Sequence, residues 1–115
     1  MEQGGESAVT SDAYSRVVAY GLFGTFVAAE GERDELVRHL LHAAALLADD
    51  PGCRQYVVGA TGDHDVAVFE VWDDKSAHDS SLRREDIRAL IEVVRPLIVG
   101  VGSQTVVDVR GGKGV

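Results

Sequence analysis

The segment "VFEVWDDKSAHDSSL", Val68 to Leu82, holds the side chains best suited to do chemistry in this chain. Strand-like alternation ends at Trp72, the only tryptophan, and His78 follows six residues later. Histidine suits general base catalysis near neutral pH. Glu70, a carboxylate within the strand, is either turned to solvent or paired in a pocket. A plainer interpretation also fits, in which Trp72 caps a core and His78 is a surface residue at a helix start.

Other reactive groups lack the context that their chemistry needs. His39 and His42 are three residues apart on a predicted helix, but no HExxH pattern or third ligand completes a metal site. "GVGSQT" at 100–105 and "GGKG" at 111–114 fail as nucleotide loops, because no helix or Ser/Thr follows as required. Cys53 has no base beside it and suits packing. The sequence predicts neither a metal site nor a bound cofactor.

Composition limits the classes of function. The chain has 115 residues, which fits one domain, with 45% hydrophobic and 26% charged residues. A net charge of -8 argues against binding to nucleic acid or to an anionic membrane. One cysteine allows no intrachain disulfide, and neither a signal peptide nor a membrane-spanning run is visible. We expect a soluble cytoplasmic protein.

The periodicity divides the chain into a mobile tail over residues 1–15, one domain over 16–110 and a flexible end over 111–115. In the helix over 30–50, apolar residues including Leu36, Leu40 and Leu41 recur at helical spacing. A turn with a first helical turn covers 73–82, and a long helix covers 84–99. Strands are predicted over 17–28, 53–60, 65–72 and 101–110. This βαββαβ order predicts a ferredoxin-like α+β fold, with an antiparallel sheet and two helices on one face.

The strands carry apolar residues on both faces of this sheet. In the first strand, Leu22 and Phe26 alternate with Phe23 and Val27. A sheet face open to water should be polar, and the chain has no further element to cover the second face. We therefore predict a homodimer that packs sheet to sheet, with cavities between helices and sheet or between the two copies.

Four features resemble the antibiotic biosynthesis monooxygenase domains. "EGERDELVRHLLHAAALLADDPGCRQYVV" is similar to the family's acidic helix start, Pro-Gly-Cys turn and tyrosine-bearing strand. "VFEVWDDKSAHDSSL" is similar to its strand with Glu-x-Trp, and "RALIEVVRPLIVG" to its second helix. The fourth feature is the order of the elements. The likeness covers about residues 17 to 110, and order and spacing together make it fairly specific.

This resemblance implies a dimeric α+β barrel and an oxygenation without metal, haem or flavin. The expected partners are a small aromatic substrate and dioxygen. An electron-rich hydroquinone or anthrone loses a proton to a base, and the anion passes an electron to dioxygen. The radicals recombine, and the hydroperoxide loses water to leave a quinone. The protein supplies an apolar pocket, a base and hydrogen bonds.

The resemblance also assigns site residues. Glu70 and Trp72 fall on the family's Glu-x-Trp, and the family's histidine nine residues later is Ser81 here. Residues 78 and 81 share a face if this segment is helical, so His78 becomes the predicted catalytic base. The residues predicted to contact the substrate are Trp72, Glu70, Ser81, Tyr56 and Phe26. The chain has no asparagine, which disfavours the haem-degrading branch of this fold.

Two other functions remain open on the same fold. One is a non-enzymatic dimeric module that binds a small apolar ligand as a sensor or stress protein. The other is an isomerase or decyclase-like enzyme that needs no oxygen. The fold alone does not choose between them and a monooxygenase.

Overall fold

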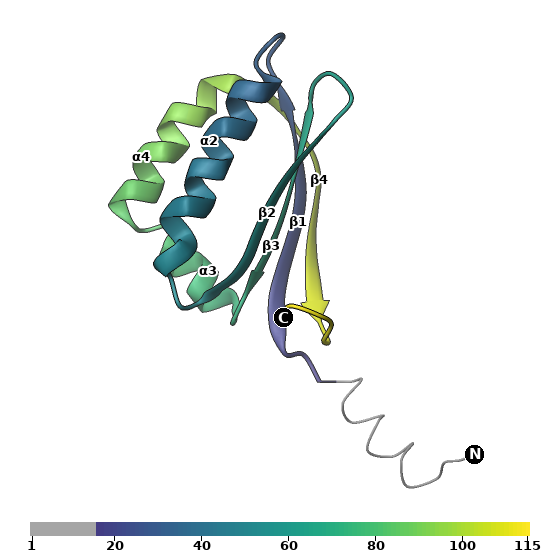
Figure 1. Ribbon diagram of the computed structural model, residues 1–115, viewed down its shortest axis with the longest axis vertical. Coiled ribbons are helices and arrows are strands. Elements are labelled where there is room, and N and C mark those ends of the chain that lie inside the picture. Colours follow the sequence, from purple (N-terminus) through teal and green to yellow (C-terminus); the bar gives the residue numbers. More distant parts are fainter. Residues whose placement is uncertain (1–15) are drawn as a thin grey trace, which may run out of the picture.

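The computed structural model describes residues 16–115, so the predicted tail over 1–15 lies outside the described residues. Helices and strands carry the labels of Figure 1. The strands are β1 (Ala19–Ala28), β2 (Cys53–Thr61), β3 (Asp65–Trp72) and β4 (Ile98–Val109). The helices are α2 (Arg33–Leu46), α3 (Lys75–Ser81) and α4 (Glu85–Val94), and 3₁₀ turns cover Leu47–Asp49 and Arg95–Leu97.

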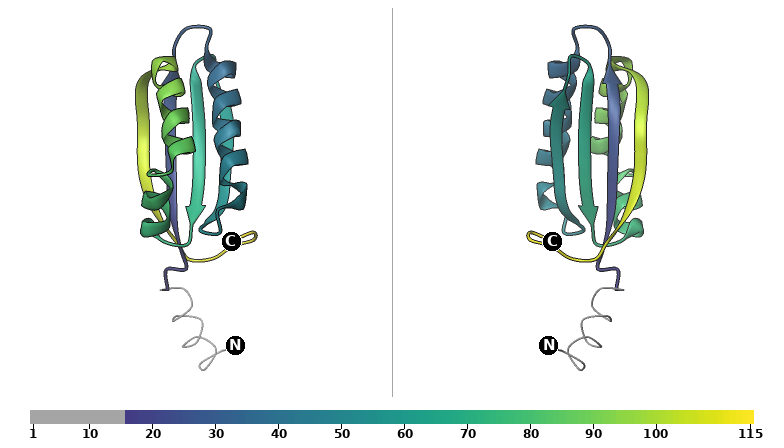
Figure 2. Two further views of the ribbon diagram at one scale, coloured as in Figure 1. Left: turned by 90° about the vertical axis from the view of Figure 1, so that its left-hand side faces the viewer. Right: turned by 90° about the vertical axis from the view of Figure 1, so that its right-hand side faces the viewer.

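The strands form one antiparallel sheet in the order β2-β3-β1-β4. All three helices lie on one face of this sheet, and the other face carries no helix from the described residues (Figures 1 and 2). The predicted ferredoxin-like α+β fold is therefore confirmed. We call the face without helices the open face.

The segment after β3 differs from the prediction, because two helices replace one helical turn and one long helix. Asp74 caps α3, and its Oδ1 accepts a hydrogen bond from the Ala77 backbone N–H at 2.8 Å. The helix ends at Ser81, and α4 begins at Glu85 in a new direction. Pro96 lies in the 3₁₀ turn that follows α4, since proline cannot donate the next helical hydrogen bond.

The hydrophobic core lies between the helices and the sheet. Leu36 of α2 and Val66 of β3 are fully buried there. Leu41 was expected to join the apolar face of α2, but its side chain is 52% exposed. The residues that α2 and the turn after it bury are Leu36, Leu40, Ala43 and Leu47, which follow the helix periodicity more closely.

The open face carries a row of apolar side chains that crosses three strands. Val57, Phe69 and Phe23 are register partners on β2, β3 and β1, and Val57 and Phe23 are 55% and 39% exposed. At one end of this face Val71 is buried, and Gln55 Nε2 donates to the Gly114 carbonyl at 3.0 Å. The C-terminal residues therefore contact this end of the face, where the sequence had indicated no cover from the chain. The middle stays exposed.

Candidate active site

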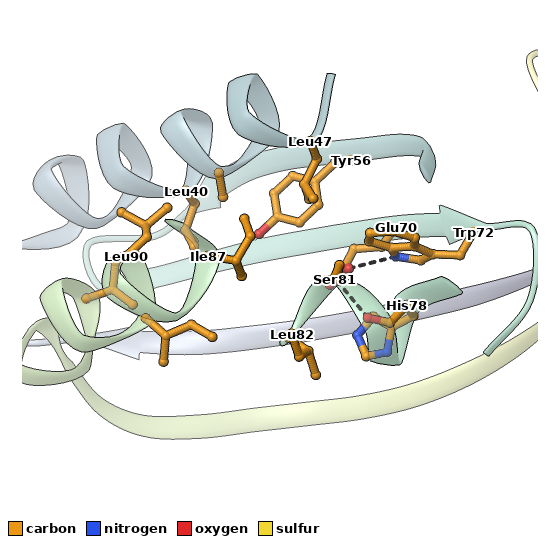
Figure 3. A pocket seen from close by; sticks show the side chains of 13 residues that line it. Leu40, Leu47, Tyr56, Glu70, Trp72, His78, Ser81, Leu82, Ile87 and Leu90 are labelled. Carbon is orange, nitrogen blue, oxygen red and sulfur yellow. Dashed lines mark hydrogen bonds between the residues drawn. The ribbon is translucent and has the colours of Figure 1, made fainter. Parts of the chain in front are cut away.

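A cavity of about 110 Å³ lies between the helices and the sheet (Figure 3). Five of the six predicted site residues line it, namely His78, Trp72, Glu70, Ser81 and Tyr56. Phe26 does not line this cavity and packs against the hydrophobic core instead. The remaining lining residues, which the sequence reasoning did not select, are aliphatic: Leu40, Ala43, Leu47, Leu82, Ile87, Leu90, Ile91 and Val94.

The sheet places Tyr56, Glu70 and Trp72 by strand register alone. Tyr56 and Glu70 are direct partners on β2 and β3, so their side chains lie next to each other on the helix-covered face. Trp72 is two residues beyond Glu70 on the same strand and shares that face. The indole is fully buried, and its Nε1 donates to Glu70 Oε1 at 2.9 Å. Glu70 is therefore a paired carboxylate in a pocket.

Helix α3 brings His78 and Ser81 to the same cavity. The two residues are three apart on this helix, which places both on one face. Ser81 is buried, and its hydroxyl donates to the His78 carbonyl oxygen at 2.6 Å. Because the Ser81 hydroxyl hydrogen is bound to a carbonyl of the same helix, Ser81 can only accept a hydrogen bond from a ligand.

The His78 ring is held by its neighbours. It makes an edge contact with Trp72, with ring centroids 5.6 Å apart, and its centroid lies 6.0 Å from that of the Tyr20 ring. Its Nδ1 lies 3.1 Å from Asp79 Oδ1. Lys75 Nζ binds Asp79 Oδ2 at 2.7 Å, and the hydrogen bonds from Lys75 and His78 lower the pKa of Asp79.

These contacts select one tautomer of His78. An ionised carboxylate can only accept hydrogen bonds, so Asp79 keeps the proton on Nδ1 and leaves the lone pair on Nε2. A neutral imidazole in this state is ready to accept a proton. Sequence reasoning missed Asp79 and Tyr20. Asp79 had a signal, since it follows His78 directly and comes four residues after Lys75.

The cavity holds two acidic groups whose charged forms are disfavoured. Burial raises the pKa of Glu70, while the Trp72 hydrogen bond and the nearby His78 act in the opposite direction. Burial also raises the pKa of the Tyr56 phenol, and the charge on Glu70 adds to this effect. At neutral pH, Tyr56 is therefore a neutral hydrogen-bond donor.

Two polar atoms in the cavity have no partner in residues 16–115. The Tyr56 hydroxyl, which points towards Ile87 in Figure 3, makes no hydrogen bond within this part of the chain, and Glu70 Oε2 accepts none. A buried polar group without a partner costs about 1–3 kcal/mol. A ligand that pairs with both atoms would recover this cost.

Cys53 lies near this site but is not an activated nucleophile. Burial, with the charges of Glu70 and Asp50, raises the pKa of its thiol to about 11. The thiol is thus protonated at neutral pH, and Sγ lies 3.6 Å from the Gln55 carbonyl oxygen. Among residues 16–115, no three His, Cys, Asp or Glu side chains gather closely enough to hold a metal ion.

Replacing Glu70 by glutamine is expected to stabilise the protein at pH 7. The raised pKa means that the folded wild type favours the protonated carboxyl, so it loses stability as pH rises through that pKa. Glutamine does not ionise and escapes this loss. The advantage should vanish below about pH 4, where Glu70 is protonated in both the folded and the unfolded chain. Urea unfolding between pH 3 and 8 measures this difference.

The control for this prediction is Glu92→Gln on the exposed side of α4. Glu92 pairs with Arg95 at 2.9 Å, and both side chains are largely exposed. Its replacement removes one negative charge without touching the cavity. If Glu70→Gln is less stable than wild type at pH 7, or if its gain in stability does not change with pH, then burial does not disfavour the charged form of Glu70.

The fold and the cavity together define the class of this protein: a ferredoxin-like α+β domain with a cavity between its helices and its sheet. Comparison with known proteins then identifies the family. The family model described as antibiotic biosynthesis monooxygenase matches residues 19–93, which is well over half of the chain. The chain therefore belongs to the antibiotic biosynthesis monooxygenase family. No curated protein matches it.

Solved structures place the chain among proteins of this kind. It is 32% identical to a protein from Chloroflexus aurantiacus J-10-fl assigned to the antibiotic biosynthesis monooxygenases, covering 82% of this chain and 95% of that one, with a TM-score of 0.76. SnoaB, a cofactor-independent oxygenase from Streptomyces nogalater, shares the fold in a mutant form at 17% identity, covering 84% and 97%, with a TM-score of 0.70. None of the helices within residues 16–115 has the length and apolar character of a membrane span.

Proposed function

We propose that this protein is a cofactor-independent monooxygenase that oxidises a hydroquinone, an anthrone or a related phenolic with dioxygen. One observation carries the proposal: an apolar cavity holds the His78 imidazole, with Nδ1 at 3.1 Å from Asp79 Oδ1, beside the buried carboxyl group of Glu70. Membership of the antibiotic biosynthesis monooxygenase family supports it. SnoaB, which shares the fold, is a cofactor-independent oxygenase.

The proposed reaction takes all its electrons from the substrate. A base removes a proton from the phenol or anthrone, and the resulting anion passes one electron to dioxygen. The substrate radical and superoxide combine to form a carbon–oxygen bond, and protonation gives a hydroperoxide. Cleavage of its oxygen–oxygen bond releases water and leaves a carbonyl. One oxygen atom of dioxygen enters the quinone product, and the other leaves as water.

The residues of the cavity have defined parts in this scheme. His78 Nε2 accepts the substrate proton, and the imidazolium that forms stabilises the adjacent anion, with Asp79 stabilising the imidazolium in turn. Glu70 and Tyr56 hold the oxygen atoms of the ring, and Trp72 forms a wall. The aliphatic side chains of α2 and α4 keep water away from the radicals.

Oxygen uptake by metal-free protein tests this proposal. Purified protein should accelerate oxygen consumption with menadiol, hydroquinone or an anthrone above the spontaneous rate, and the reaction should stop under nitrogen. A product formed at the same rate without oxygen would point to an isomerase. Ligand-dependent stabilisation with no turnover across the panel would point to a binding module.

We also propose that the protein is a homodimer joined through the open face. Val57 and Phe23 expose apolar side chains in the middle of this face, with Phe69 between them. Such a row on an antiparallel sheet favours burial against a second apolar surface. A second copy supplies that surface, because a two-fold axis brings the same residues together.

Replacing Val57 by aspartate is expected to convert the dimer to a monomer at micromolar concentration. An unpaired carboxylate would be buried where two sheets meet, so the dimer should weaken by more than about 100-fold. Analytical ultracentrifugation measures the change. Leu41→Asp is the matched control, because Leu41 is similarly exposed but lies on α2. A wild type that is monomeric, or a Val57→Asp dimer as tight as wild type, rejects the interface.

A further inference from the structure

We propose that the cavity selects a neutral aromatic molecule of a single ring with a hydroxyl group, and that Glu70 and Tyr56 set this selection. The inference narrows the substrate class of the proposed function. Its oxygen-uptake experiments rest on that function, whereas its binding experiments do not. Three properties of the site support the selection: its size, its charge and its unpaired polar atoms.

The size of the cavity suits one ring. Its volume is about 110 Å³. A dry cavity of roughly 150 Å³ lined by aliphatic and aromatic side chains binds benzene in another protein. A three-ring anthrone needs a far larger space than a single ring. Trp72 and Ile87 are buried on the wall, so deepening the cavity would require core side chains to move, and a larger ligand would have to extend outwards past the exposed Leu82.

The charge of the cavity excludes anions. Glu70 is the one carboxylate among the lining residues, and within residues 16–115 no Lys or Arg lines the cavity. A carboxylated ligand would bury a second carboxyl group beside Glu70 in apolar surroundings. Within residues 16–115, His78 is the one lining side chain that can become positively charged, and it already lies close to Glu70. The site therefore favours ligands without a negative charge.

The unpaired atoms specify the functional groups of the ligand. Glu70 Oε2 can accept a hydrogen bond, and the Tyr56 hydroxyl can donate one. These residues are register partners on neighbouring strands, so both side chains enter the cavity from adjacent positions. A ring hydroxyl can pair with either group, because it can donate to Glu70 or accept from Tyr56. A hydrocarbon ring satisfies neither.

Binding under nitrogen at pH 8 tests this inference without oxidation. The probes are hydroquinone, which is uncharged at this pH, 2,5-dihydroxybenzoate, which adds a carboxylate to the same ring, and 1,8-dihydroxyanthrone, which has three rings. Trp72 is the only tryptophan and lines the cavity, so its emission reports binding of the single-ring probes. Calorimetry measures the anthrone, which absorbs in the same range.

Wild type should bind hydroquinone at least about 10-fold more tightly than either other probe, as expected for an uncompensated buried charge or a poor fit. Glu70→Gln should narrow the difference in affinity between hydroquinone and 2,5-dihydroxybenzoate, because the second carboxyl group is gone, whereas the exposed Glu92→Gln should keep the wild-type ratio. Tyr56→Phe should weaken hydroquinone by about 5-fold, the effect of one lost hydrogen bond. Equal binding of hydroquinone and 2,5-dihydroxybenzoate by wild type, or anthrone binding as tight as hydroquinone, overturns the inference.

The same probes separate this inference from the proposed function. Selective binding of hydroquinone without oxygen uptake in air leaves the selectivity standing and rejects the monooxygenase. Oxygen uptake with the three-ring or carboxylated probe at the same rate as with hydroquinone supports the monooxygenase and rejects the selectivity. Turnover of hydroquinone alone supports both.

Discussion

Replacing His78 by alanine is expected to lower kcat/KM for a phenolic substrate by about 10²- to 10⁴-fold, the usual contribution of a positioned general base. The reason is geometric. Asp79 holds the proton on Nδ1, and the Trp72 and Tyr20 rings hold the imidazole at the cavity. No other imidazole lines this cavity within residues 16–115. Oxygen uptake at several substrate concentrations measures the loss.

The control for His78 is His42→Ala, because His42 lies on α2 away from the cavity. Its replacement should leave kcat/KM unchanged. Circular dichroism should find both variants folded, since neither side chain belongs to the buried core. If His78→Ala keeps the wild-type rate and pH profile, His78 is not the base, and Glu70 becomes the group to replace next.

Replacing Trp72 by alanine is expected to remove about 3–5 kcal/mol of the free energy of unfolding, the range for a large aromatic truncated in a core. Trp72 is fully buried and packs with Leu47 and Ile87. Its loss opens a cavity and also leaves Glu70 without its indole hydrogen bond. A domain of this size has only about 5–15 kcal/mol in total, so the variant should be close to unfolding.

Trp72→Phe separates the two parts of this effect. Phenylalanine keeps most of the volume but cannot donate to Glu70, so its cost should be clearly smaller than that of alanine. Urea unfolding followed by far-ultraviolet circular dichroism measures both variants without tryptophan emission. Leu82→Ala is the control, because Leu82 lines the same cavity but is 44% exposed. If Trp72→Ala lowers the free energy of unfolding no more than Leu82→Ala does, Trp72 does not support the structure of the site.

Much of the fold and part of the site could be predicted from local patterns. Alternation along β3 places Glu70 and Trp72 on one face, because side chains two apart on a strand share a face. The three-residue spacing of His78 and Ser81 places both on one face of a helix. Both relations depend only on the period of the element, so the sequence is enough to predict them.

The features that the sequence did not predict depend on contacts between distant segments. The partnership of Tyr56 with Glu70 is set by the register of β2 on β3, which no local pattern fixes. Phe26 packs against the core cluster, away from the cavity. The contact of Gln55 with Gly114 joins residues 59 apart. The break between α3 and α4 follows from packing as well as from the Asp74 cap.

Labelled dioxygen tests the proposed chemistry most directly. Metal-free protein is supplied with ¹⁸O₂ and hydroquinone in unlabelled water. The quinone product is trapped at once, and its ¹⁸O content is measured by mass spectrometry. A cofactor-independent monooxygenase should place one ¹⁸O atom in each product molecule, and replacing His78 by alanine should slow the formation of labelled product by at least about 100-fold. A product without ¹⁸O, formed at the same rate under nitrogen, would contradict oxygenation and favour proton-transfer chemistry at this site.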